Sequence, residues 1–149
     1  MELYVDADAC PVKEEAVRVA ERHGMVVHMV SNQWMRLPES PMVRRVTVAG
    51  GLNIADDWIV EHVQPNDIVV TADIPLAARC LEKKARVLGP AGKPFDPESI
   101  GMALAMRELN AQLRDVGIIN GNASAFSRKD RSRFLCALEE VIQAILRGR

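Results

Sequence analysis

The residues best suited to chemistry in this chain are aspartates that directly follow apolar segments. Asp6 and Asp8 come after the apolar residues 3–5 and shortly before Pro11. A strand of a parallel sheet is buried on both faces, so a carboxylate at its end requires a structural or functional reason. Ligands of open α/β sheets bind at the carboxyl ends of the strands. We therefore expect Asp6 and Asp8 to belong to a ligand site, although Asp8 could instead cap the following helix.

Asp73 repeats this arrangement, because it follows the apolar residues 68–70 and precedes Pro75. It could also cap a helix, but its carboxylate would lie near Asp6 if the two strands are neighbours. Asp56 lies in the first turn of a predicted helix, at the flank of the apolar face, whereas Asp57 falls nearly opposite that face and should be solvated. The helix dipole favours acidic residues in a first turn, so Asp56 also has a purely structural explanation.

Oxygen ligands of this kind are typical of a site for a hard divalent cation. Mg²⁺ and Mn²⁺ prefer carboxylate oxygens and water, and they often also bind the phosphate of a substrate. Carboxylates held together without a cation repel one another, which raises their pKa values. A metal in such a site can activate water and stabilise the leaving oxygen of a phosphodiester. The sequence therefore predicts Mg²⁺ or Mn²⁺ as cofactor, with the following catalytic and metal-binding residues: Asp6, Asp8, Asp56 and Asp73.

A basic cluster marks the start of the predicted C-terminal helix, with four cations in six residues: Arg128, Lys129, Arg131 and Arg133. Cations are unfavourable at the amino end of a helix dipole, which favours phosphate contact as their role. An ordinary solvated run of charges is the other interpretation. The net charge is −1, but residues 1–100 carry a net −4 and residues 101–149 a net +3. Chance or a combination of metal and phosphate sites explains this asymmetry.

The elements that must position these residues alternate between strands and helices. Apolar runs predict strands over residues 3–6, 25–30, 43–48, 67–71 and 85–88, and helical spacing predicts helices over 11–23, 53–63, 75–84, 99–113 and 130–147. This alternation is typical of a parallel sheet covered by helices on both faces. We expect one α/β domain over residues 1–149, with three layers, a mostly parallel sheet of about five strands, and the C-terminal helices packed back on that sheet.

Composition argues against several other classes of protein. No apolar run approaches the roughly 20 residues that a membrane-spanning helix needs. Cys10, Cys80 and Cys136 are odd in number and lack metal-type spacing, and no signal peptide is recognisable, so we expect free thiols and a cytoplasmic location. Aromatic residues make up only 4% of the chain, which disfavours base stacking on an aromatic platform as the way in which this surface holds a ligand.

Four segments carry a resemblance to a known family: residues 6–11 (Asp-Ala-Asp-Ala-Cys-Pro), Ala55-Asp56, residues 67–78 and residues 129–131. Together they resemble the YaiI/YqxD family of uncharacterised bacterial proteins, which is grouped with the PIN-like domains. The resemblance implies a PIN-like fold and a metal-dependent ribonuclease that acts on single-stranded RNA. It also implies an acidic site at the sheet edge formed by Asp6, Asp8, Asp56 and Asp73, with Thr71 as a supporting hydroxyl. Nuclease activity is inferred for this family from its PIN-like relatives.

The sequence departs from the family pattern at Asn53, where an aspartate is expected, at Ala91, where an arginine is expected, and over residues 120–123. A non-catalytic PIN-like module that binds RNA or protein therefore remains an alternative. A haloacid-dehalogenase-like phosphatase also begins with a strand and Asp-x-Asp. It is disfavoured because no lysine lies between Lys13 and Lys83, and because Pro11 opens a helix at once.

Overall fold

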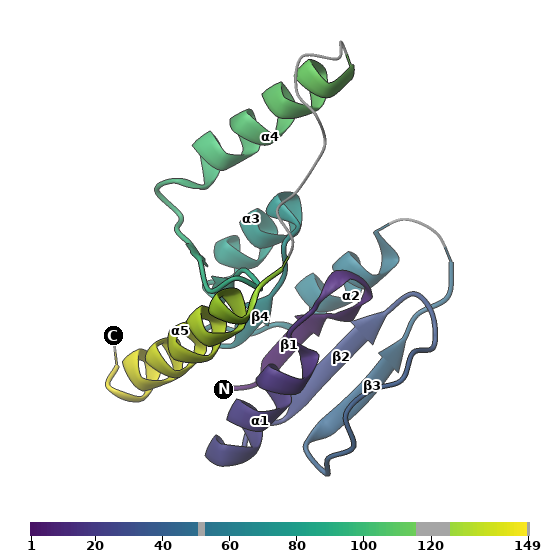
Figure 1. The fold of residues 1–149 in the computed structure, drawn as a ribbon, viewed down its shortest axis with the longest axis vertical. Helices are drawn as coiled ribbons and strands as arrows, with labels where there is room; N and C mark the ends of the chain where they lie inside the picture. Colours follow the sequence, from purple (N-terminus) through teal and green to yellow (C-terminus); the bar gives the residue numbers. More distant parts are fainter. Residues whose placement is uncertain (51–52, 116–125, 149) are drawn as a thin grey trace.

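The computed structural model describes residues 1–50, 53–115 and 126–148. Its six strands form one sheet in the order β3-β2-β1-β4-β5-β6, in which β1 to β5 run parallel (Figure 1). The strands are β1 (Leu3–Asp6), β2 (Val27–Ser31), β3 (Val43–Thr47), β4 (Ile68–Val70), β5 (Arg86–Leu88) and β6 (Pro94–Phe95). The predicted α/β class and the five parallel strands are confirmed. The sequence did not predict β6, because two residues that include a proline carry no strand pattern.

The helices are η1, a 3₁₀ turn (Ala7–Ala9), α1 (Lys13–His23), α2 (Ile54–His62), α3 (Ile74–Glu82), α4 (Ile100–Asp115) and α5 (Arg128–Leu146). The prediction that Pro11 opens the first helix is wrong, since η1 and a turn intervene and α1 begins at Lys13. The last helix begins at Arg128, before the predicted start at Asp130. Ser127 and Asp130 form a reciprocal capping box that accounts for this start.

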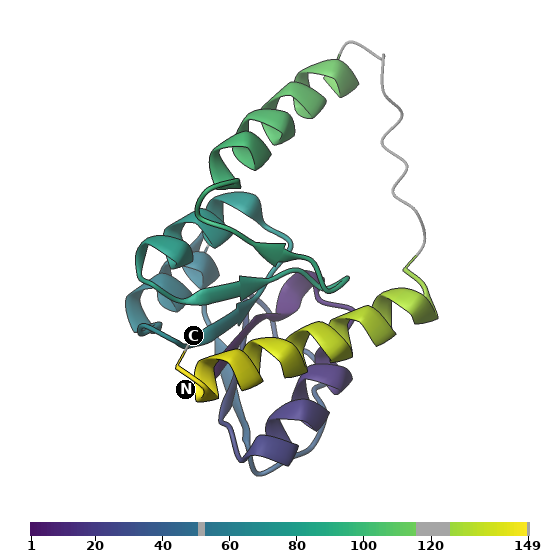
Figure 2. The same cartoon turned by 90° about the vertical axis from the view of Figure 1, so that its left-hand side faces the viewer.

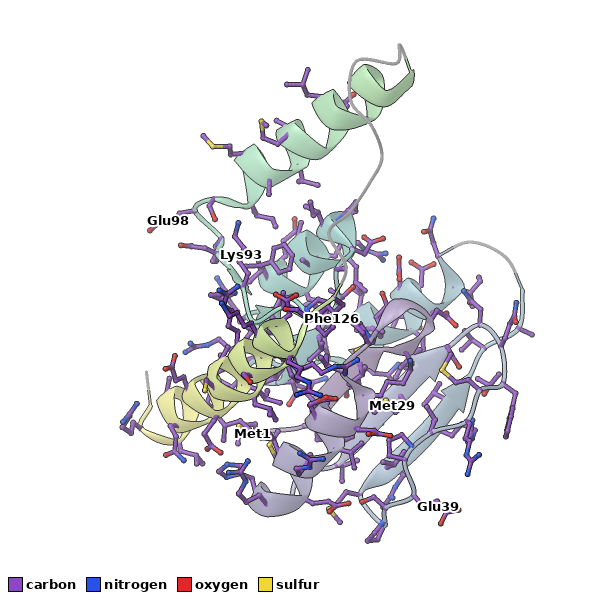
Figure 3. The ribbon with its side chains drawn as sticks, viewed as in Figure 1. Met1, Met29, Glu39, Lys93, Glu98 and Phe126 are labelled. Atoms are coloured by element: carbon purple, nitrogen blue, oxygen red, sulfur yellow. The ribbon has the colours of Figure 1, made fainter. Side chains whose placement is uncertain are left out.

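Helices cover the two faces of the sheet, which gives three layers (Figure 2). Side chains alternate between faces along each strand, so Val5 points to one core and Tyr4 to the other. α1 and α5 close the first core, where Phe134, Leu138 and Ile142 are fully buried. α2 and α3 close the second core, and side chains fill the space on both sides of the sheet (Figure 3).

α4 differs from the prediction that both C-terminal helices pack back on the sheet. Its first residue, Ile100, packs against the second core, and part of the helix contacts α3. The rest extends away from the sheet (Figure 2), and Met102, Met106 and Leu109 are 74%, 49% and 45% exposed. Helical spacing shows that α4 has an apolar face, but spacing does not specify what covers that face. Residues 120–123, where the sequence departs from the family pattern, lie outside the described residues.

The order of the strands reverses between β1 and β4. From β1 the chain adds β2 and then β3 on one side, and it returns to place β4 on the other side. Val5 pairs with Val70, so the carboxyl ends of β1 and β4 lie side by side. Such a switch point is where open α/β sheets hold their ligands. Within the described ranges, no helix has the length and apolar character needed to span a membrane.

Candidate acidic site at the switch point

The ends of β1 and β4 are joined by the hydroxyl of Thr71. Its Oγ1 donates a hydrogen bond to Asp6 Oδ2 at 2.9 Å and accepts one from the backbone N–H of Asp73 at 3.0 Å. Thr71 is only 2% exposed, so this hydroxyl has little access to water and its orientation is set by these two partners. Thr71 therefore holds the Asp6 carboxylate in a defined position beside the backbone of Asp73.

Asp73 caps a helix, which is the structural role that the sequence allowed for it. Its Oδ1 accepts a hydrogen bond from the N–H of Leu76 at 2.9 Å, which caps the amino end of α3. The cap also determines where the carboxylate can point, because it ties one oxygen to the first turn of α3. Asp73 is thus both a helix cap and a side chain at the switch point.

A cavity of about 260 Å³ lies between these two aspartates, lined by Asp6, Cys10, Val70, Thr71, Ala72, Asp73 and Pro90. The sequence did not predict that Pro90 lines it, because Pro90 follows β5 in a Gly/Pro-rich connection without a functional signal. Cys10 is 5% exposed, and burial raises the pKa of its thiol to about 11. The acidic groups of the cavity are therefore Asp6 and Asp73.

The carboxylates around this cavity influence one another. Partial burial raises the pKa of Asp6, and the negative charges of Asp8 and Asp73 raise it further, while the hydrogen bond from Thr71 acts in the opposite direction. Burial and the charges of Asp73 and Asp6 raise the pKa of Asp56 to about 6. Asp56 does not line the cavity, yet it is close enough to the two aspartates to be affected by both.

Asp57 and Asn53, the neighbours of Asp56 at the start of α2, make different contacts. The carboxylate of Asp57 pairs with Arg79 at 2.8 Å on the surface, and Asp57 is not among the residues that line the cavity. The exposed position agrees with the prediction from helix geometry that Asp57 is solvated. Asn53 occupies the cap position of α2, but it has a positive φ of 71° and its side chain makes no capping hydrogen bond. The helix dipole and burial of Ala55 and Ile59 therefore remain as the local reasons for this helix.

Asp8 lies apart from the cavity. It sits in η1 on the surface, and its Oδ2 accepts a hydrogen bond from the N–H of Asn32 at 2.9 Å. The expectation that it caps the following helix is wrong, because Asp8 lies within η1 and Val12 occupies the cap position of α1. Its carboxylate instead connects the end of β1 to the loop after β2, and it reaches the acidic site only through its charge.

Carboxylate oxygens suit a hard cation, but few of them lie close together. In the described residues, no three His, Cys, Asp or Glu side chains are grouped closely enough to hold a metal ion. Mg²⁺ commonly takes only one or two protein carboxylates and keeps several waters. Asp6 and Asp73 meet that smaller requirement with oxygen ligands alone. The four-aspartate metal set stays a prediction.

The four residues of the predicted basic cluster make different contacts. Arg131 turns toward α1, where it donates to the carbonyl of Pro11 at 2.6 Å and to Glu15 at 3.2 Å. Arg133 lies 3.8 Å from Asp130 in a surface ion pair. Arg128 and Lys129 are exposed in the first turn of α5. A role for these four residues in binding nucleic acid stays a prediction, and Arg131 alone lines a cavity.

Replacing Asp56 by asparagine should stabilise the metal-free protein above pH 6 and have little effect near pH 4. The pKa of Asp56 rises from 3.8 to about 6 on folding, so its ionised form opposes folding and the stability of wild type falls as pH rises through 6. Solvent screening limits the gain to about 1 kcal/mol. Thermal melts of both proteins in a chelator across this pH range test it. A constant difference at all pH values would contradict it.

Comparison with known proteins identifies the family. The profile of the family described as "Uncharacterized BCR, YaiI/YqxD family" matches residues 4–144. This chain belongs to the YaiI/YqxD family. A UPF0178 protein of Parvibaculum lavamentivorans is 60% identical over 146 residues, which cover 98% of this chain and 96% of the relative. A UPF0178 protein of Rhodospirillum rubrum is 56% identical over 150 residues and the full length of both chains.

These relatives confirm the resemblance to the YaiI/YqxD family that the sequence motifs indicated. Their names describe no activity, ligand or partner. No solved structure matches the chain significantly. The comparisons therefore establish membership of an uncharacterised bacterial family, and the function has to be argued from the acidic site itself.

Proposed function

We propose that this YaiI/YqxD protein is a Mg²⁺- or Mn²⁺-dependent nuclease that hydrolyses phosphodiester bonds of single-stranded RNA. The observation that carries the proposal is the joint placement of Asp6 and Asp73. Both line the 260 Å³ cavity at the switch point of the sheet, and Thr71 contacts both residues there. Sites for phosphate-containing ligands recur at this position in open α/β folds.

Asp6 and Asp73 would hold the cation, and the charge of Asp56 would add to its attraction. The fit is supported by the raised pKa of Asp6, because a carboxylate destabilised by burial and by like charges gains most from a cation. Within the part of the chain that the structure describes, Asp6 Oδ1 accepts no hydrogen bond, so it is available as a ligand atom. Thr71 would keep Asp6 Oδ2 in place, in the way that outer hydrogen bonds orient metal ligands.

A bound divalent cation supplies an activated water and stabilises the leaving oxygen of the phosphodiester. The protein itself would contribute by holding the two carboxylates in fixed positions. The cap on α3 holds Asp73, and the buried Thr71 hydroxyl holds Asp6, so neither carboxylate has to be ordered when the substrate binds. The cavity is small, with Val70 and Pro90 as apolar walls, which favours an exposed phosphate over a bulky base.

A non-catalytic module that binds RNA or protein is the second candidate. Asn53 stands where relatives were expected to have an aspartate, and the described residues contain no cluster of three metal-binding side chains. One argument against the phosphatase alternative fails, because Pro11 does not open a helix and α1 begins at Lys13. The other is supported, because no lysine is among the described residues that line the acidic cavity.

Metal binding can be tested without measuring catalysis. We expect Mn²⁺ or Mg²⁺ to raise the melting temperature of wild type and to leave that of Asp73→Ala unchanged, relative to each protein in chelator. Asp57→Asn is the matched control, because it removes a neighbouring carboxylate that already pairs with Arg79, and its metal-induced shift should equal that of wild type. Equal shifts in wild type and Asp73→Ala would contradict a metal site at Asp73.

The nuclease activity itself is tested with purified protein and a labelled single-stranded RNA. Cleavage should require Mn²⁺ or Mg²⁺ and stop in chelator. Wild type that binds metal but cleaves no single-stranded RNA with either cation would overturn the nuclease proposal and favour the binding module.

A further inference from the structure

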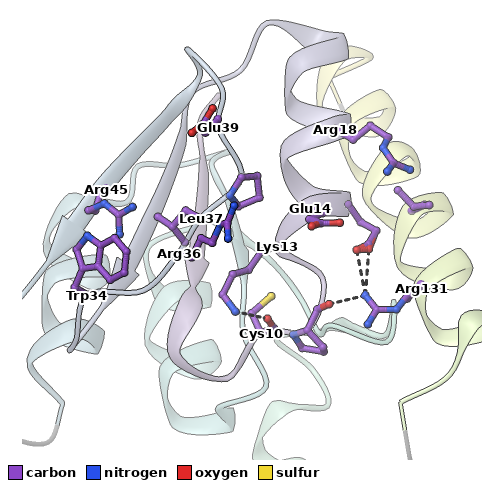
Figure 4. A pocket seen from close by; sticks show the side chains of 14 residues that line it. Cys10, Lys13, Glu14, Arg18, Trp34, Arg36, Leu37, Glu39, Arg45 and Arg131 are labelled. Atoms are coloured by element: carbon purple, nitrogen blue, oxygen red, sulfur yellow. Dashed lines mark hydrogen bonds and ion pairs between the residues drawn. The ribbon is translucent and has the colours of Figure 1, made fainter.

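A second, larger cavity of about 1360 Å³ lies beside the acidic cavity, between α1, the loop after β2, β3 and α5. It is an open groove, and its charged and aromatic walls include Lys13, Arg18, Trp34, Arg36, Arg45 and Arg131. Figure 4 shows Trp34 and Arg45 on one side, Arg18 and Arg131 on the other, and Lys13 and Arg36 between them. We refer to it as the basic groove.

The basic groove has an excess of positive charge. Its five cations face three acidic residues, Glu14, Glu15 and Glu39. Glu15 is 8% exposed and paired with Arg131 at 3.2 Å, so its charge is largely compensated from within the protein. The net charge of the whole chain is −1, which makes a local excess of cations a specific feature of this face. The groove therefore suits a polyanion.

Trp34 gives this surface an aromatic contact. Trp34 is 71% exposed, whereas the other tryptophan, tyrosine and phenylalanine residues that the structure describes are buried or partly buried. The Arg45 guanidinium lies 5.0 Å from the centroid of the Trp34 ring and covers one face of the indole. Arg45 also donates to the carbonyl of Met35 at 2.5 Å, so the arrangement of the ring and guanidinium is anchored to the loop. The other face of Trp34 is left for a planar group.

The basic groove adjoins the acidic cavity at one shared residue. Cys10 lines both cavities, and Nζ of Lys13 donates to the carbonyl of Cys10 at 2.7 Å. A strand lying along the groove would therefore pass Lys13 before it reaches Asp6 and Asp73. The cations of the basic groove would contact phosphates of this strand, and one phosphodiester would lie at the acidic cavity.

We propose that the basic groove binds single-stranded nucleic acid, with one unpaired base stacked on Trp34 and phosphates contacted by Arg36 and Lys13. Stacking on one exposed indole needs an unpaired base, so a duplex does not fit this site. One tryptophan suffices here, which is compatible with the low aromatic content of the chain. The direction of the strand toward Asp6 rests on the proposed nuclease function, whereas binding in the groove does not.

Binding is measured with the full chain and fluorescein-labelled oligouridylate by fluorescence anisotropy, in chelator so that no cleavage occurs. Trp34→Ala should weaken binding about tenfold, whereas Trp34→Phe should retain most of it, because phenylalanine still offers a stacking face. Arg36→Ala should weaken binding and reduce the dependence of log Kd on log salt by about 0.7, which corresponds to one phosphate contact on a single strand.

Arg22→Ala is the matched control, since Arg22 is a surface arginine of α1 that is paired with Glu139 at 3.5 Å and does not line the groove. Its affinity should equal that of wild type. The proposal is overturned if Trp34→Ala or Arg36→Ala binds like wild type, or if Arg22→Ala is weakened as much as Arg36→Ala. It is also overturned if a duplex or an acidic peptide such as polyglutamate competes as well as oligouridylate.

The test separates the two proposals. Groove-dependent binding in chelator, together with no cleavage when Mn²⁺ is added, would support the groove and overturn the nuclease. Cleavage that is insensitive to Trp34→Ala and Arg36→Ala would overturn the groove and leave the acidic site standing.

Discussion

Asp6→Asn is expected to lower Mn²⁺-dependent cleavage of single-stranded RNA by at least about a hundredfold. Loss of a group that only orients a metal ligand typically costs 10- to 100-fold, and Asp6 is proposed as a ligand itself. The substitution removes the charge but keeps an oxygen that can accept the hydrogen bond from Thr71, which is 2.9 Å from Asp6 Oδ2 in wild type. The loss should therefore reflect chemistry at the site and not a disordered sheet edge.

The measurement is the initial rate of cleavage of a labelled RNA by equally pure proteins. Asp57→Asn provides the control, because it makes the same chemical change at an exposed surface pair with Arg79, and its rate should stay within a factor of about two. Equal cleavage by wild type and Asp6→Asn would show that the activity comes from a contaminating nuclease. Melting curves in chelator should show Asp6→Asn to be at least as stable as wild type, because burial raises the pKa of Asp6 and makes its ionised form costly.

Phe134→Ala is expected to lower the free energy of unfolding by about 3–5 kcal/mol. Phe134 is fully buried where α5 joins α1 and the sheet, and it is among the largest buried side chains. Gly92, after β5, packs so tightly against α5 that a Cβ there would lie 2.7 Å from the Arg133 backbone, which leaves little room for the helix to move inward and fill a void. Removing the ring would therefore leave most of its volume as a cavity.

Urea denaturation followed by circular dichroism tests this expectation. Met102→Ala is the matched control, because Met102 is a large apolar residue of the preceding helix α4 with 74% of its surface exposed. Its substitution should change the free energy of unfolding by no more than about 0.5 kcal/mol. A loss below about 1 kcal/mol for Phe134→Ala would mean that α5 is not an integral part of the core. The result also concerns the basic groove, because Arg131 of α5 lines one wall of that groove.

The sequence by itself determined the parts of this protein that depend on local pattern. Apolar runs and helical spacing predicted five parallel strands and the helices around them, with errors of a few residues at the ends. Aspartates at the ends of β1 and β4 were predicted to lie at one sheet edge, and the structure places Asp6 and Asp73 in one cavity. The angular position of Asp56 and Asp57 on α2 was also predictable, because side-chain direction on a helix follows from residue spacing alone.

Only the tertiary structure decided which of these residues meet. That β1 and β4 are neighbours depends on strand pairing across more than 60 residues, and no local signal encodes it. Asp8 binds Asn32, and Arg131 binds Glu15, through contacts between distant segments that no spacing rule anticipates. The basic groove arises in the same way, from α1, α5 and the loop after β2. The aspartates were visible in the sequence because each ends its own strand, whereas a groove exists only once separate elements have packed together.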